Sequence, residues 1–117
     1  IIDRDPRDIF IDFPHHRYLP RNVDNLEKAR CFIHFFKSLR KKIKEVAQLE
    51  FCLLLSFEEL VINYEETIRQ IEDFLGISDK NENLKKKLFS PEKSIKNIKK
   101  YKKLNNTYNS SIELIEK

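Results

Sequence analysis

The fold is decided by one stretch of sequence, Ile1-Ile2-Asp3-Arg4-Asp5-Pro6-Arg7-Asp8. Its opening isoleucines are typical of the end of a buried strand. Asp5 is a good N-cap for a helix, and Pro6 suits the first helical turn because its missing N–H would be unpaired there anyway. The stretch therefore predicts a strand-to-helix turn, followed by a helix that continues to about Phe13.

Working outward, the next two elements are a long helix and a second strand. A long amphipathic helix is predicted after Asn22 or Asp24, either of which can cap it. Residues Phe51–Leu55 form a continuous apolar run of strand length. A run without alternation predicts a strand covered on both faces, as in a parallel sheet. The apolar stripe expected on the long helix consists of Val23, Leu26, Ala29, Ile33, Phe36, Leu39, Ile43 and Val46.

The remaining elements are predicted to be helical. One helix begins at about Tyr64 and ends at Gly76, where a left-handed backbone costs glycine little. A short helix is expected around Leu84–Phe89, with a break at Ser90-Pro91. The order strand, helix, strand, helix predicts an α/β fold built on a βαβ unit, with parallel strands, a right-handed crossover and predominantly helical content. The stripe expected on the helix from Tyr64 consists of Ile68, Ile71, Phe74 and Leu75.

Length and composition limit the possible functions. The 117 residues allow one domain at most, and 40% hydrophobic with 36% charged residues is ordinary for a globular protein. The lone glycine, Gly76, excludes a glycine-rich phosphate loop within this sequence. Residues Lys85–Lys103 include nine lysines and one acid, Glu92. This excess indicates either an anionic partner or a solvated surface.

Cysteines and histidines carry little functional information. Cys31 and Cys52 lie in apolar runs and are interpreted as small buried hydrophobes, which fits a reducing compartment. The start of the chain is unlike a signal peptide, and its apolar runs are too short to span a bilayer, so a cytoplasmic location is expected. No metal site is expected, because no further ligand stands at a suitable spacing from His15, His16 or His34.

Arg4 is the strongest candidate for binding an anion. In open parallel sheets, ligands sit beyond the carboxyl ends of the strands, where Arg4 is expected. The N–H groups of the following helix favour an anion, and an arginine can clamp a phosphate with two hydrogen bonds. An ion pair of Arg4 or Arg7 with Asp5 or Asp8, which would only stabilise the turn, is an equally good interpretation.

Three stretches, taken in order, resemble the sulfotransferase family. Ile1–Ile9 is similar to its 3′-phosphate segment, Leu54–Ile77 to its later strand, turn and Phe-Leu-Gly helix, and Ser94–Lys102 to the segment that closes over the donor. The resemblance covers roughly Ile1 to Lys103. It implies a P-loop-like α/β fold, the donor 3′-phosphoadenosine 5′-phosphosulfate, and in-line sulfuryl transfer to a hydroxyl or amine, with a glycan among the candidate acceptors.

The resemblance also implies site residues near the two strand ends. Arg4 takes the position of the 3′-phosphate ligand. Its usual serine partner, eight residues later, is replaced by Asp12, which would repel a phosphate unless protonated or turned away. Phe57 replaces the tyrosine on the adenine side, so stacking is kept and a hydroxyl contact is lost.

The tail contributes the remaining expected contacts. Lys96 and Asn97 are the expected donor contacts, and Lys99 stands where the family has a glycine, which puts a tight backbone approach in doubt. On residues alone, the lysine-rich segment Lys93–Lys102 could fold over a nucleotide or form a disordered basic tail.

The resemblance further implies that residues 1–117 are the C-terminal part of one sulfotransferase domain. Residues 1–60 would form the strand–helix–strand unit with the 3′-phosphate segment, and residues 61–117 a helix and a basic donor-closing tail. The phosphosulfate loop and the catalytic base would lie upstream, so we expect these 117 residues alone to show no transferase activity. Two alternatives stay open: a degenerate non-catalytic relative, and a basic helical module that binds nucleic acid or an acidic surface, although nucleic acid is not favoured.

Overall fold

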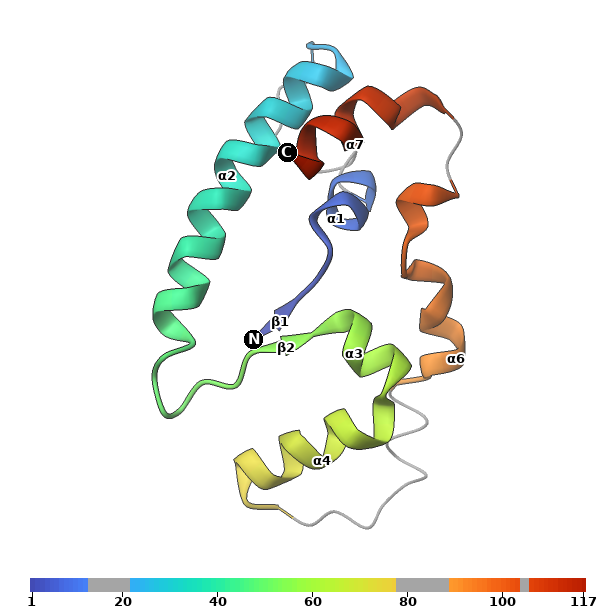
Figure 1. Ribbon diagram of the computed structural model, residues 1–117. Helices are drawn as coiled ribbons and strands as arrows, with labels where there is room; N and C mark the ends of the chain where they lie inside the picture. The colour runs from blue at the N-terminus through green and yellow to red at the C-terminus, as the bar shows by residue number, and fades with distance from the viewer. Residues whose placement is uncertain (13–21, 78–88, 104–105) are drawn as a thin grey trace.

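The computed structural model describes residues 1–12, 22–77, 89–103 and 106–117. The predicted loop between Pro14 and Pro20, and the predicted short helix up to Leu88, lie outside these residues. The described chain is mostly helical with a small sheet, as Figure 1 shows. Its elements are β1 (Ile2–Asp3), α1 (Pro6–Asp12), α2 (Asn25–Val46), β2 (Leu55–Ser56), α3 (Phe57–Ile62), α4 (Tyr64–Leu75), α6 (Pro91–Ser94), the 3₁₀ turns η1 (Ile95–Asn97), η2 (Lys100–Lys102) and η3 (Asn106–Tyr108), and α7 (Asn109–Glu116).

The sheet joins the two predicted strand regions. β1 and β2 pair in parallel, with Ile2 opposite Leu55 and Asp3 opposite Ser56. The connection between them carries two helices, α1 and α2, so the predicted parallel arrangement and the mainly helical content are confirmed. This pairing places the residues that follow each strand, Arg4 and Phe57, at the same edge of the sheet.

The prediction of a strand buried on both faces is wrong. Only Leu55 of the apolar run Phe51–Leu55 is in β2, and the Phe51 side chain is 76% exposed. Ile2 on β1 is also exposed. The physical reason is that the sheet of the described residues has two strands and no helical layer over this part of it, so a continuous apolar run has nothing to pack against.

The main core lies where α1, α2 and α7 meet, at the end of the molecule that is upper in Figure 1. The Phe32 ring is at its centre, with ring centroids 5.3 Å from both Phe10 and Phe36. Because α1 and α7 come from opposite ends of the sequence, this core ties the two ends of the described chain together. Its buried members are Phe10, Ile11, Ala29, Phe32, Phe36 and Ile112.

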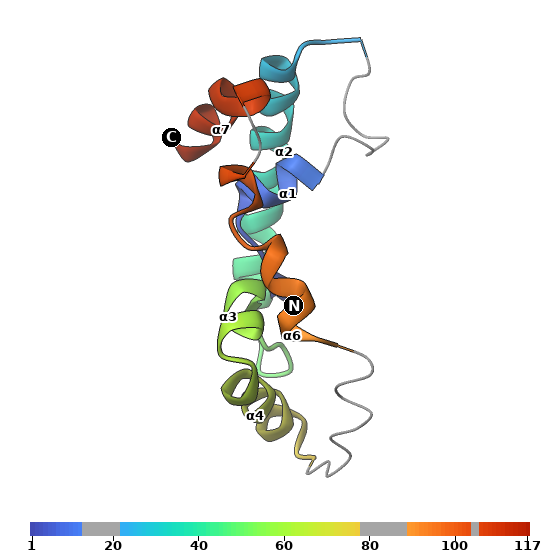
Figure 2. The ribbon, with the colours of Figure 1, turned by 90° about the vertical axis from the view of Figure 1, so that its right-hand side faces the viewer.

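α2 buries a narrower face than the predicted stripe. Its buried residues are Ala29, Phe32 and Phe36, whereas Leu39 and Val46 of the predicted stripe are exposed. Figures 1 and 2 show that α2 extends well past α1 and α7, so its second half lacks a covering helix in the described chain. Of the two predicted caps, Asp24 is the one that acts: its Oδ1 accepts the Glu27 N–H at 2.8 Å.

α4 has the predicted bounds but not the predicted buried face. It begins at Tyr64 and stops at Gly76, whose φ of +63° is the left-handed conformation that favours glycine. Its one buried residue is Thr67, while Phe74 and Leu75 are exposed. In the described chain α4 packs mainly on the short helix α3, which is too small to cover an apolar stripe twelve residues long.

Two other sequence expectations concern the cysteines and the membrane. Cys31 and Cys52 are free thiols and half-buried, so they are less enclosed than predicted. In the part of the chain that the structure describes, no helix combines the length and apolar character needed to cross a bilayer.

Candidate functional site

The turn between β1 and α1 is fixed by its acidic residues. Asp5 caps α1: its Oδ1 accepts the Arg7 backbone N–H at 2.9 Å, and Pro6 occupies the first helical position, as predicted. The Arg7 side chain folds back on the same carboxylate at 2.5 Å and also reaches Glu116 on α7 at 2.6 Å. The predicted turn-stabilising ion pair therefore exists, but Arg7 supplies it and leaves Arg4 for other contacts.

Glu58 connects this turn to the end of β2. Its Oε1 accepts the Asp5 backbone N–H at 2.9 Å, and its Oε2 accepts the Ser56 hydroxyl at 2.8 Å. The Ser56 Oγ in turn accepts the backbone N–H groups of Glu58 and Glu59 and caps α3. The Glu58 carboxylate thus connects the two strand ends and fixes the backbone next to Arg4.

Arg4 lies at the centre of the candidate site. Its Nη1 donates to Asp12 Oδ2 at 2.7 Å, and its Nη2 donates to the Asn97 backbone carbonyl at 2.8 Å. The guanidinium lies over the Phe57 ring, 5.3 Å from the centroid, a distance typical of a cation–π contact. Its Nε is buried and has no hydrogen-bond partner among the described residues.

Asp12 closes the site between two cations. Lys100 donates to Oδ1 of the same carboxylate whose Oδ2 accepts from Arg4. Burial by itself would raise the pKa of the Asp12 carboxyl, but the hydrogen bonds from Lys100 and Arg4 and their charges outweigh it and lower the pKa below its usual value. Asp12 is therefore ionised at neutral pH and occupies the Arg4 donor that was expected to bind a phosphate, together with Lys100.

The tail is held over the site by its backbone. Asp8, fully buried in the first turn of α1, accepts the Tyr101 backbone N–H on Oδ1 at 2.9 Å. Lys99, just before η2, takes a left-handed conformation with φ of 52°, which is unfavourable for a residue with a side chain. This turn points the backbone of η2 toward α1 and brings Lys100 to Asp12.

The site thus joins residues from the first 12 positions, from the turn after β2 and from the tail. All three segments lie within the match to one family model. The family model described as "Sulfotransferase domain" matches residues 1–116. The chain belongs to the sulfotransferase domain family. No curated protein and no solved structure gives a significant match to the chain.

In this sulfotransferase domain, four of the five predicted site residues lie together. Arg4, Asp12, Phe57 and the carbonyl of Asn97 are in mutual contact through the Arg4 guanidinium. Lys96 is not among them: its side chain is exposed, and its carbonyl accepts from Lys103 Nζ at 3.2 Å. Whether any of the five binds a donor stays a prediction.

Two residues of the candidate site, Lys100 and Glu58, were not predicted from the sequence. Lys100 was only one lysine in the tail stretch, and its pairing with Asp12 spans 88 residues of sequence. Glu58 lies within the stretch Leu54–Ile77 and had no predicted role. The available signal was Ser56 followed by acids, a pattern typical of a helix N-terminus, but no helix was predicted to start there.

The described residues contain no cluster of side chains that could hold a metal ion. In residues 1–12, 22–77, 89–103 and 106–117, no three His, Cys, Asp or Glu side chains gather as a metal site would require. His34 is exposed on α2, and the other two histidines lie outside the described residues.

Proposed function

We propose that this chain is the C-terminal part of a sulfotransferase domain with a P-loop-like α/β fold, and that it binds the 3′-phosphate end of 3′-phosphoadenosine 5′-phosphosulfate. The whole domain would transfer the sulfuryl group to a hydroxyl or amine acceptor, with a glycan among the candidates. The observation that carries this proposal is the convergence of Arg4 and Lys100 on a single carboxylate, Asp12, in a chain of this family.

The donor set suits a phosphate. Arginine supplies planar paired donors and lysine a point charge, and both are common phosphate ligands. The two come from segments at opposite ends of the chain, so the cations meet only when the tail is in place. The Arg4 Nε has no hydrogen-bond partner among the described residues and is a further donor that could serve a phosphate. The Phe57 ring beside Arg4 supports stacking of a purine next to this point.

The Asp12 carboxylate competes with a phosphate for Arg4 and Lys100. Because its pKa is lowered, protonation cannot release Arg4 at neutral pH, so a phosphate must displace the carboxylate from both cations. A dianionic phosphate brings more charge than a carboxylate, which favours the exchange once Asp12 turns toward solvent. Its side chain is about one-third exposed, so a path to solvent exists.

The proposed roles divide along the chain. Residues 1–60 would carry Arg4, Asp12 and Phe57, and residues 61–117 would supply the helix and the tail that closes over the donor through Lys96, Asn97 and Lys100. Sulfuryl transfer requires donor and acceptor in line and stabilised charge on the transferring group. We therefore expect nucleotide binding but no sulfuryl transfer by these 117 residues alone.

Calorimetric titration of the chain with adenosine 3′,5′-bisphosphate tests the proposal. Adenosine 5′-monophosphate, which lacks the 3′-phosphate, should bind at least about ten-fold more weakly, since charge-assisted hydrogen bonds are lost. Lys100→Gln should weaken binding of the bisphosphate by about ten-fold for the same reason. The matched control is Lys102→Gln, in the same 3₁₀ turn, whose ammonium lies near the Tyr101 ring and away from Asp12. Equal binding of the two nucleotides, or equal effects of the two lysine variants, would refute the 3′-phosphate site.

A second candidate function is that of a non-catalytic relative, and the Asp12 carboxylate in the place of the phosphate favours it. If neither the wild-type chain nor Asp12→Ser binds the bisphosphate, this reading replaces the first. The remaining alternative, a basic module for nucleic acid, predicts binding that falls steeply with salt and is indifferent to the nucleotide.

A further inference from the structure

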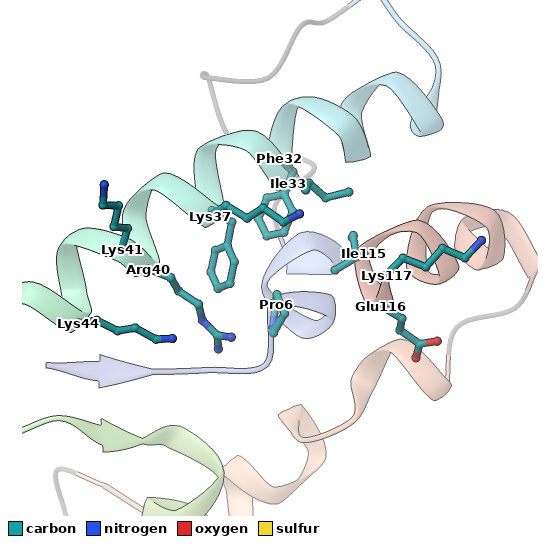
Figure 3. A pocket seen from close by; sticks show the side chains of 11 residues that line it. Pro6, Phe32, Ile33, Lys37, Arg40, Lys41, Lys44, Ile115, Glu116 and Lys117 are labelled. Atoms are coloured by element: carbon teal, nitrogen blue, oxygen red, sulfur yellow. The ribbon is translucent and has the colours of Figure 1, made fainter.

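A groove separate from the proposed nucleotide site lies between α2 and α7, beside Pro6. Its volume is about 480 Å³, within the range of small-molecule sites. Figure 3 shows its walls: α2 on one side, Ile115 of α7 on the other, and Pro6 of the β1–α1 turn between them. Arg4, Asp12 and Phe57 do not line it.

One wall of the groove is cationic. Lys37 and Lys44 extend from α2 toward the side where Pro6 and α7 lie (Figure 3). They stand seven residues apart, two helical turns, so they lie on one face of α2 about 10 Å from each other. Both are exposed, and neither has an ion pair within the described residues. Arg40, between them, is already held by Asp3 at 2.8 Å.

The floor of the groove is apolar. Ile33 and Phe36 of α2 and Ile115 of α7 line it, together with Pro6. The Arg40 guanidinium lies over the Phe36 ring, 4.9 Å from its centroid, and this contact holds the Arg40 side chain in the lining of the groove. The one acid in the lining, Glu116, is paired with Arg7 at 2.6 Å. The groove therefore offers apolar contact and positive charge that is not neutralised by its own lining.

We propose that this groove binds a small organic anion, a molecule with an apolar ring or chain and a sulfonate, sulfate, phosphate or carboxylate group. The apolar part would lie on Ile33 and Ile115, and the acidic group would meet Lys37 or Lys44. Small-molecule sites combine a mainly apolar lining with a few polar groups that fix orientation, and this groove has that composition. The site does not depend on the proposed nucleotide function.

Two other occupants fit the groove less well. A single-stranded nucleic acid needs exposed aromatic rings for base stacking, but Phe32 and Phe36 in the lining are buried. A membrane surface needs apolar side chains that protrude, whereas these lie at the bottom of a hollow between two helices. The neighbouring hollow by Asp5, Glu58 and Glu116 is also less suitable, because the acids in its lining cancel the charge of Arg7 and Arg40.

Fluorescence titration with anilinonaphthalene sulfonate, an aromatic sulfonate, tests the proposal on the 117-residue chain. We expect saturable binding at one site, weakened about five-fold or more by Lys37→Glu and by Lys44→Glu, because each reversal replaces attraction by repulsion. Lys42→Glu is the matched control: it makes the same charge change on the same helix, at an exposed residue that does not line the groove. It should alter the affinity less than about two-fold, since exposed charges farther away are screened.

Two further measurements make the outcome decisive. The uncharged analogue N-phenylnaphthylamine should bind more weakly than the sulfonate, and methyl NMR signals of Ile33 and Ile115 should shift as the sulfonate binds. Thermal melts of the three variants should match the wild type, so that lost binding is not lost folding. The proposal is wrong if Lys42→Glu weakens binding as much as the groove variants, if the uncharged analogue binds equally well, or if the two isoleucine signals stay unchanged.

Discussion

The Arg4 guanidinium lies 2.7 Å from the Asp12 carboxylate, although Arg4 precedes α1 and Asp12 is its last residue. Asp12 is the last residue of that helix, where the negative end of the helix dipole disfavours a carboxylate, and the last turn contains no basic residue of its own. Arg4 and Lys100 supply the compensating charge from outside the helix. The pair is therefore both a local stabiliser of α1 and a competitor for any anion that approaches Arg4.

Replacing Asp12 by serine, the residue usual at this position in the resembled family, should tighten binding of adenosine 3′,5′-bisphosphate. We expect a gain of about ten-fold, because the phosphate no longer has to displace a carboxylate from two cations. Calorimetric titration measures it. Asp73→Ser, an exposed acid on α4, controls for the general loss of one negative charge; a gain of the same size there would show that Asp12 does not compete locally.

The Asp12 ion pairs should appear in the pH dependence of stability. The pKa of Asp12 is lowered in the folded chain, so its contribution is complete above the usual carboxyl value of 3.8 and is lost as the pH falls through the lowered pKa. Urea unfolding between neutral and acidic pH should show the stability of the wild type falling toward that of Asp12→Asn below about pH 4. Asp5, whose pKa is also lowered, titrates in both proteins and cancels in the comparison. A difference between the two proteins that does not change with pH would contradict the assignment.

Lys99→Gly should stabilise the chain by about 0.5–1 kcal/mol, because a left-handed backbone is strained for lysine and not for glycine. The relief of this strain outweighs the greater conformational freedom that glycine gives the unfolded chain. Urea unfolding at neutral pH measures the change. The matched control is Lys96→Gly in η1, where φ is not positive, which should destabilise the chain. Destabilisation by both substitutions would mean that the strain at Lys99 is relieved in solution.

Phe32→Ala should cost about 3–5 kcal/mol of unfolding free energy, because it leaves a cavity at the centre of the core. Phe32 is 1% exposed and stacks on Phe36, whereas Phe35, three residues along the same helix, is 51% exposed. Phe35→Ala should therefore change stability by less than about 0.5 kcal/mol. Thermal and urea unfolding of the two variants measure the difference between a ring enclosed in the core and a neighbouring exposed ring on the same helix.

Local chemistry in the sequence predicted the helix ends well. Asp5 and Pro6 start α1, Asp24 caps α2, and Gly76 ends α4, and each acts within a few residues of its own position. The buried faces of the helices were harder to predict because they depend on which other helix packs against them. α1 and α7 cover Phe32, which the stripe predicted for the long helix omitted. Leu75 belonged to the stripe predicted for the helix from Tyr64, and it is exposed because α4 packs mainly on α3 in the described chain.

The candidate site likewise contains residues that were expected from the sequence and residues that were not. Arg4 was a candidate from the strand-to-helix turn, whereas Phe57 was expected only from the family resemblance. Lys100 was not, because a run of lysines does not show which one faces an acid 88 residues away. Asn97 accepts the Arg4 hydrogen bond with its backbone carbonyl. Every residue has such a carbonyl, so the sequence cannot indicate which one accepts. The residues alone indicated that this segment could fold over a nucleotide, and the family resemblance named Lys96 and Asn97 as the expected contacts.

The core formed by α1, α2 and α7 also has a consequence for how the protein is made. Phe10 and Ile11 are synthesised well before Ile112, so their contact with Ile112 must wait until that residue has also been translated. At about 5–20 residues per second, the early segments spend several seconds without that cover. During that interval the ribosome-bound chain exposes the aromatic face of α2, so chaperone occupancy should fall when α7 emerges from the exit tunnel.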